Sequence, residues 1–321
     1  MTAYLLRRTL LLVISLLLAS SVLFLLLRLL PGDPANSLLS VGATPEQVAA
    51  ARHEIGSDLP LPEQFASWIG RMATLDLGRS FISSLPVGPE IAGRLVVTAP
   101  LTILAFLLAV LISVPAGFVT AHRRGTWYGS LLGGVSQFGL AVPVFWVGML
   151  LITVFALHLR LLPAGGFPAD DWADPAAALT SLVLPVLTVS LVMSASLIRY
   201  VHSAALDVLG SDYLRTARAL GSSFAGAIWR HGLRNAAVPV VSILGIELAT
   251  TFLGAVVVEN VFALPGLGSM LVKAFAQHDY PVIQGILVLS TFTVLLIGFL
   301  ADVVQRLIDP RLRRTATGGP E

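Results

Sequence analysis

Apolar residues are gathered in long runs that contain almost no charge, and shorter polar connections separate these runs. Each run is long enough to cross a hydrocarbon core of about 30 Å as an α-helix. The pattern therefore predicts an all-α, polytopic membrane protein with six transmembrane helices. The predicted spans are residues 8–28, 95–121, 127–157, 175–198, 236–258 and 282–301.

Charge at the ends of these spans predicts the orientation. Lys and Arg gather on the cytoplasmic side of bacterial membrane proteins, and the larger set falls there if the N-terminus is inside, for example Arg7, Arg8, Arg123 and Arg124. Six spans then place both termini on that side. We expect a multi-pass protein of the plasma (inner) membrane with cytoplasmic N- and C-termini.

The outer connection, residues 31–94, is too long to be a simple turn. Thr44 and Gln47 resemble a capping box, which predicts a short helix that ends near Gly56. A second short helix is expected after Pro62. Its apolar stripe is expected on the membrane surface or against the outer helix ends; the stripe consists of Phe65, Trp68, Ile69 and Met72.

The cytoplasmic connection has an amphipathic helical pattern, and we name it the elbow (about residues 203–235). One stripe is apolar and suits a helix that presents one face to another protein; it contains Tyr213, Ala217, Leu220, Phe224 and Ile228. Glycine costs about 1 kcal/mol relative to alanine inside a helix. Gly221 therefore predicts a bend between two short helices.

Composition removes several classes of function. The chain has no cysteine, which excludes disulfides and thiolate chemistry. Its six histidines lack metal-binding spacing, so we assign no metal and no cofactor. Although the net charge is +2, the arginines follow membrane boundaries, and we expect no nucleic-acid partner. The chain also lacks a GxxxxGK[ST] phosphate loop, so any ATP must be hydrolysed by another subunit.

The elbow carries the most specific motif in the chain. Residues 212–221 read DYLRTARALG and residues 230–236 read RHGLRNA. These segments closely resemble the permeases of the dipeptide, oligopeptide and nickel ABC importer family. Arg215, Thr216, Ala217 and Gly221 occupy the positions of that family's EAA-x-x-x-G motif, with arginine in place of the glutamate.

The resemblance extends along nearly the whole chain. Similar signatures are LPGDP at 30–34, DLGRS at 76–80, PGLG at 265–268 and DYPVIQG at 279–285. One departure is His278, where the family commonly has arginine.

The resemblance implies the transmembrane domain of a type I ABC importer with a cytoplasmic coupling helix. It implies three parts: a first helix and long external segment (1–94), the importer domain (95–307) and a cytoplasmic tail (308–321). The implied partners are a second homologous permease in a heterodimer, two cytoplasmic ABC ATPases, an external substrate-binding protein and the lipid bilayer. The residues expected to couple to the ATPase are Asp212, Tyr213, Arg215, Thr216, Ala217, Arg218, Leu220 and Gly221.

Two further sites are expected. Glu247 is the one acid well inside a predicted span, where a charge is costly, so it is expected to face the translocation pathway or a partner. Contact with the external binding protein is expected at the outer end of the fifth span, although turn chemistry alone can explain this sequence; the residues are Glu259, Pro265, Gly266 and Gly268.

The expected function is therefore a permease subunit that forms half of a pathway for di- or oligopeptides and hydrolyses nothing itself. A nickel chelate or glutathione remains an alternative cargo. An ion-coupled secondary transporter is the alternative from another class, but such proteins commonly carry several intramembrane ionisable groups and only Glu247 qualifies here. An intramembrane hydrolase is disfavoured because no GxSxG motif occurs.

Overall fold

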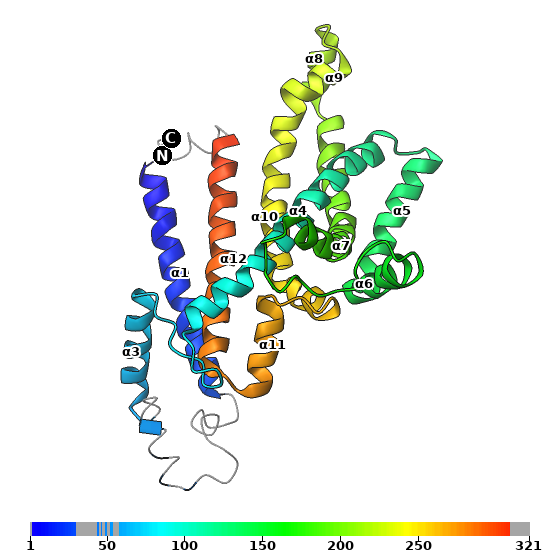
Figure 1. Cartoon of the computed structure of the whole chain (residues 1–321). Coiled ribbons are helices and arrows are strands. Elements are labelled where there is room, and N and C mark those ends of the chain that lie inside the picture. The colour runs from blue at the N-terminus through cyan, green and yellow to red at the C-terminus, as the bar shows by residue number, and fades with distance from the viewer. Residues whose placement is uncertain are drawn as a thin grey trace.

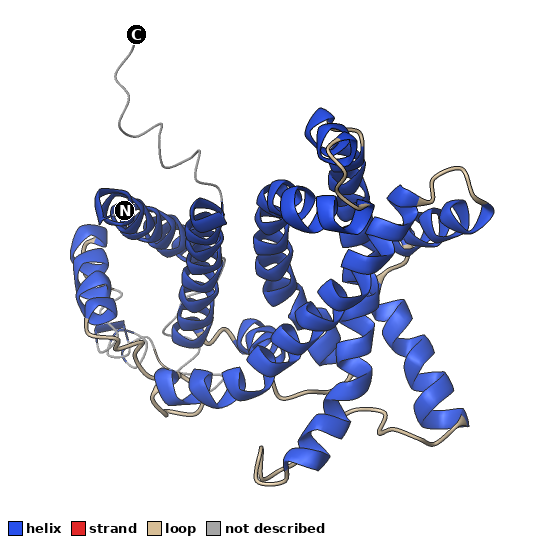
Figure 2. Cartoon of the chain, turned by 90° about the horizontal axis from the view of Figure 1, so that it is seen from above, coloured by secondary structure: helices blue, strands red, loops and turns tan. Residues whose placement is uncertain are grey.

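The computed structural model describes residues 2–29, 44, 46, 49, 52, 53 and 58–308. Within these residues the structure is helical, and the only pairing of extended backbone is an isolated bridge between Arg79 and Pro86 (Figure 2). The all-α prediction is confirmed. Most of the helix expected between Thr44 and Gly56 lies outside the described residues, and Glu46, Ala49, Arg52 and His53, which are described, are helical. The tail after Ile308 lies outside them entirely.

Five helices are long and apolar enough to cross a membrane. They agree with five of the six predicted spans, and each extends beyond the predicted bounds. These helices are α1 (Thr2–Leu29), α4 (Val87–His122), α7 (Pro175–Leu209), α10 (Leu233–Val261) and α12 (Tyr280–Ile308). The domain boundary expected between residues 94 and 95 falls inside α4.

The remaining span prediction, 127–157, is wrong as a single helix. Two helices, α5 (Trp127–Ala141) and α6 (Val144–Leu151), replace it and are bent by 104° where they meet; the π-helix η2 (Ile152–His158) continues α6. Pro143 lies at the break, and the preceding Val142 is extended, as the proline ring requires. The described residues therefore hold up to six spans if the bent pair counts as one.

Small residues let the main membrane helices approach closely. Gly117 of α4 is buried against α7, and a methyl group at this position would clash with Val201 and the Ile198 carbonyl oxygen. Gly245 of α10 meets Ala301 of α12 in the same way. Close backbone contact of this kind is a main source of stability between helices in lipid.

Both chain ends of the described structure lie together. The Arg8 guanidinium forms a 2.7 Å ion pair with Asp302, which joins the start of α1 to the last turns of α12. Figure 1 shows these two helix ends on the same end of the molecule as α8 and α9. We name this the elbow end. This arrangement agrees with an even number of membrane-spanning segments.

The opposite end carries two shorter helices, α3 (Leu61–Ala73) and α11 (Leu267–Gln277) (Figure 1). α3 confirms the short helix expected after Pro62. Its apolar stripe packs on the end of α1, where the rings of Phe65 and Trp68 lie 5.3 and 5.5 Å from the ring of Phe24. Of the two positions expected for this stripe, the structure shows the one against the helix ends.

Candidate functional site: the elbow and the buried carboxylates

The elbow contains two short helices and a π-helical turn. α8 (Asp212–Ala219) and α9 (Phe224–Ala227) are followed by η3 (Ile228–Gly232), which leads directly into α10. Gly221 lies between α8 and α9 with φ +89°, a left-handed conformation that favours glycine. The Ser223 hydroxyl then accepts a hydrogen bond from the Gly226 N–H at 3.2 Å and caps α9. The bend predicted at Gly221 is confirmed.

The elbow has a small apolar core of its own. Leu214, Ala217 and Ala227 are buried together, and Leu209 and Ile228 pack against them. Ala217 was expected to face the ATPase, but only 9% of it is exposed, because α8 folds back on α9 and covers this position. The structure corrects this expectation: Ala217 holds the elbow together and presents no docking surface.

Between Asp212 and Gly232, the elbow exposes three large apolar side chains. Leu220 is 82% exposed, Trp229 is 75% exposed and Tyr213 is 38% exposed. Sequence analysis identified Tyr213 and Leu220 but missed Trp229, because it followed one stripe across Gly221, where the helix breaks. Single exposed apolar residues are ordinary, whereas several on one projecting element make it a candidate for an interaction surface.

The polar residues of α8 lie on its solvent side. The Arg215 guanidinium pairs with the Asp212 carboxylate at 3.3 Å, and both side chains are largely exposed. The Thr216 hydroxyl donates to the Asp212 carbonyl at 2.9 Å and stays on its own helix. Arg215 and Asp212 are therefore accessible to a partner.

Aromatic rings connect the elbow to α4. The guanidinium of Arg218 lies 5.7 Å from the centre of the Phe224 ring, which is 4.9 Å from the imidazole of His122 at the end of α4. That imidazole stacks on Phe118 one turn earlier, at 6.0 Å. The elbow thus touches α4 through side chains in addition to its covalent links with α7 and α10.

Glu247 lies within α10 and is half-buried. The hydroxyl of Ser196 on α7 donates a 2.6 Å hydrogen bond to its Oε1. The neighbouring Ile246 is 63% exposed. One carboxylate oxygen is therefore held by α7, and the helix face beside it is not covered by this chain.

Glu259 is fully buried, so the expected contact with an external binding protein has to be corrected. Its carboxylate accepts hydrogen bonds from the Thr98 hydroxyl at 2.6 Å, the Gly268 N–H at 2.7 Å and the Ser269 N–H at 3.0 Å. These two N–H groups belong to the first turn of α11, where a negative charge is favourable. Glu259 thus caps α11 and joins it to α4 and α10.

The glycines of the Pro265–Gly268 turn have a packing role. A methyl group at Gly266 would overlap the Glu259 carboxylate, and one at Gly268 would overlap the backbone of Val256. Both glycines are buried and only Pro265 is partly exposed. Of the four residues expected to contact the binding protein, Pro265 alone has a surface available for it.

A third buried carboxylate was missed by sequence analysis. Asp279, 4% exposed, lies directly before α12 and accepts hydrogen bonds from the Ser80 hydroxyl and, at 3.0 Å, from the Phe81 N–H. Two motifs that are far apart in sequence, DLGRS and DYPVIQG, therefore meet in the structure. In the described part of the chain, no group of three or more metal-ligating side chains comes together.

Comparison with known proteins shows which family has this architecture. Residues 113–314 match the family described as binding-protein-dependent transport system inner membrane component, and residues 1–102 match the N-terminal part of the same kind of component. A peptide transport system permease protein of Brucella abortus (strain 2308) is 38% identical over 98% of this chain and 99% of its own. The glutathione transport system permease protein GsiC of Escherichia coli (strain K12) is 37% identical over the same shares.

A solved structure supports the fold. An inward-facing structure of the MetNI methionine ABC transporter superposes with a TM-score of 0.55 over 68% of this chain and 96% of that chain, at 18% identity. This likeness concerns the fold alone. Since the family match covers most of the sequence, the chain belongs to the binding-protein-dependent transport system inner membrane components and is a permease of the ABC importer type.

Proposed function

We propose that this permease forms half of a translocation pathway for di- or oligopeptides. It would pair with a second homologous permease, two cytoplasmic ABC ATPases and an external substrate-binding protein. The names of its relatives support a peptide cargo, and glutathione is a second candidate because a permease named for it is almost equally similar. Competition of unlabelled glutathione against uptake of labelled dipeptides and tripeptides distinguishes the two.

The projecting elbow is the observation that carries this proposal. It lies at the same end as both described chain ends and extends beyond α1 and α12 (Figure 1). Its exposed Tyr213, Leu220 and Trp229 would seat in a cleft on an ATPase, while Arg215 and Asp212 would contact the polar rim of that cleft. With both termini cytoplasmic, the elbow would be cytoplasmic too.

The structure supports a route by which ATPase movement would reach the membrane. η3 runs into α10 without a loop, and Phe224 touches His122 at the end of α4. A displacement of the elbow would therefore act on α7 and α10 through the backbone and on α4 through ring contacts. The core around Ala217 would keep the elbow rigid enough to transmit that displacement.

Glu247 would lie on the translocation pathway. Its second carboxylate oxygen is left for a ligand, since Ser196 engages only Oε1 among the hydrogen bonds of the described residues. A peptide ammonium group is a ligand of suitable charge.

Leu220→Ser tests the docking assignment without disturbing the elbow's core, because Leu220 is 82% exposed. Loss of one anchoring side chain at an interface typically costs enough to lower binding about tenfold. We expect ATP-driven peptide uptake in cells to fall by about that factor at unchanged abundance in the membrane. Leu75→Ser makes the same change at an 87% exposed leucine outside the elbow and should leave uptake unchanged. Full uptake by Leu220→Ser would contradict the proposal.

A further inference from the structure

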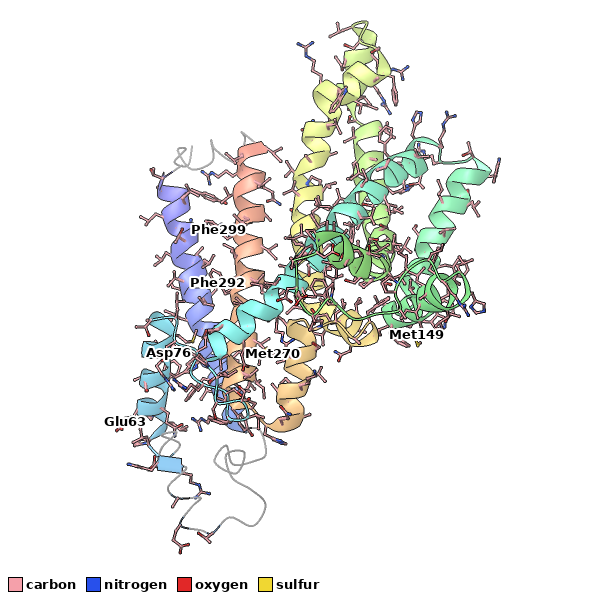
Figure 3. The ribbon with its side chains drawn as sticks, viewed as in Figure 1. Glu63, Asp76, Met149, Met270, Phe292 and Phe299 are labelled. Atoms are coloured by element: carbon pink, nitrogen blue, oxygen red, sulfur yellow. The ribbon has the colours of Figure 1, made fainter. Side chains whose placement is uncertain are left out.

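A cavity of about 650 Å³ opens at the end of the molecule opposite the elbow, between α1, α3 and α12. We name it the α1–α3–α12 cavity. Its walls come from the last turn of α1, the second half of α3, the loop after α3 and the first turns of α12. Figure 3 shows Glu63 near the start of α3 and Asp76 in the loop after this helix. This loop forms one wall of the cavity.

The charged lining of this cavity is mainly cationic. Arg28, Arg71 and Arg79 contribute three guanidinium groups, and Asp76 is the one acid among the lining residues. The carboxylate of Asp76 accepts a hydrogen bond from the Gly78 N–H at 2.9 Å and shapes the loop. Among the described residues, no carboxylate pairs with these guanidinium groups.

Part of the lining is apolar. The indole of Trp68 packs 5.5 Å from the ring of Phe24, and the Arg28 guanidinium lies 5.4 Å from the centre of the same ring. Leu25 and Leu26, next to Arg28 on α1, are each 54% exposed, so an uncovered apolar surface leads up to the charged groups. This combination suits an anion attached to an apolar tail.

We propose that the α1–α3–α12 cavity binds the anionic headgroup of a phospholipid, with its phosphate between Arg28 and Arg71 and its acyl chains along α1. Arginine recognises phosphate through paired N–H donors, and basic pockets between membrane helices bind acidic headgroups. Tyr280 and Gln284 on α12 provide further hydrogen-bonding groups. The site is separate from the elbow and from Glu247, and it stands if the assigned cargo is wrong.

Trp68 supplies a reporter, because it lines the cavity. The full chain is reconstituted in nanodiscs that contain phosphatidylglycerol or phosphatidylcholine brominated near the start of the acyl chains, and tryptophan quenching is measured. The contribution of Trp68 is the part lost in Trp68→Phe. We expect the acidic lipid to quench Trp68 at lower mole fractions than the neutral lipid, and Arg71→Gln to weaken this preference about fivefold.

Three comparisons decide the result. Arg71→Lys keeps the charge and should restore much of the preference, and Lys273→Gln, which removes an exposed charge outside the cavity, should not alter it. Equal quenching by both lipids, or an unchanged preference in Arg71→Gln, would overturn the proposal. Displacement of the lipid by millimolar inorganic phosphate would assign the cavity to a soluble anion and overturn the lipid as the source.

Discussion

The carboxylate of Glu259 illustrates how one side chain can join three helices. It lies on α10, accepts the hydroxyl of Thr98 on α4 and caps α11 through the N–H groups of Gly268 and Ser269. Thr98 and Gly268 are buried, and Ser269 is partly buried. Removal of the carboxylate would leave them without an acceptor, and such groups cost about 1–3 kcal/mol each.

We therefore expect Glu259→Ala to lower the free energy of unfolding by about 3 kcal/mol. Thermal unfolding of the detergent-purified chain, followed by loss of the monodisperse species, measures this. Glu63→Ala removes an exposed acid from α3 and is the matched control. A melting temperature for Glu259→Ala equal to that of the control would show that the cap carries no stability.

Glu247 differs from Glu259, since Ser196 donates a hydrogen bond to only one of its two carboxylate oxygens. Glu247→Gln keeps an acceptor for the Ser196 hydroxyl and removes the charge. If a peptide ammonium binds there, the lost charged hydrogen bond corresponds to about tenfold slower uptake. Labelled-peptide uptake at equal membrane abundance measures it. Ser196→Ala, which keeps the carboxylate, should transport better than Glu247→Gln, and unaltered uptake in Glu247→Gln would remove Glu247 from the pathway.

The sequence predicted the roles of some of these residues and not of others, for a physical reason. An acid at the end of an apolar run signals importance, but it does not say whether its partners come from another protein or from the same chain. For Glu259 the partners are donors of α4 and α11, distant in sequence or hidden in backbone N–H groups. Ala217 was misjudged similarly, because an apolar stripe indicates burial without identifying what covers it.

The elbow is the element in which sequence and structure agree best. Gly221 predicted the bend because a positive φ has a residue signature. The break at Pro143 divides a stretch that was predicted as one span, since the size of a bend depends on the helices that surround it. An arginine substitution at Ala217 would now disrupt the elbow's own core, so it cannot separate docking from folding.

Phe224→Ala tests transmission at the level of elements. Phe224 is the ring that joins Arg218 of the elbow to His122 of α4. We expect the reconstituted importer to retain ATP hydrolysis but to transport several times fewer peptides per ATP, because the movement would reach α4 less effectively. Measured ATPase and uptake rates give this ratio. Phe118→Ala, which removes a ring that touches His122 but not the elbow, should change it less. An unchanged ratio in Phe224→Ala would exclude the ring contact as a route.

In the whole molecule, neighbouring helices bury some helix faces and leave others exposed, and the exposed faces point to partners. Only 11% of the most apolar stretch of α1 is buried, whereas 56% of that of α7 is buried by neighbouring helices. α12 lies beside α1, and Phe292 and Phe299 lie in the middle part of α12 (Figure 3). A half-pathway is expected to leave such faces uncovered, because the second permease and lipid complete them.

The orientation of the molecule can be tested directly because the chain contains no cysteine. Leu220 at the elbow and Leu75 in the loop after α3 are 82% and 87% exposed, and α8 and α3 lie toward opposite ends (Figure 1), so Leu220→Cys and Leu75→Cys are matched reporters. If both termini are cytoplasmic, a membrane-impermeant maleimide added to intact spheroplasts should label only the cysteine at 75, and both should react after permeabilisation. Labelling of position 220 from outside would place the elbow on the external surface, where no ATPase could reach it, and would overturn the coupling mechanism.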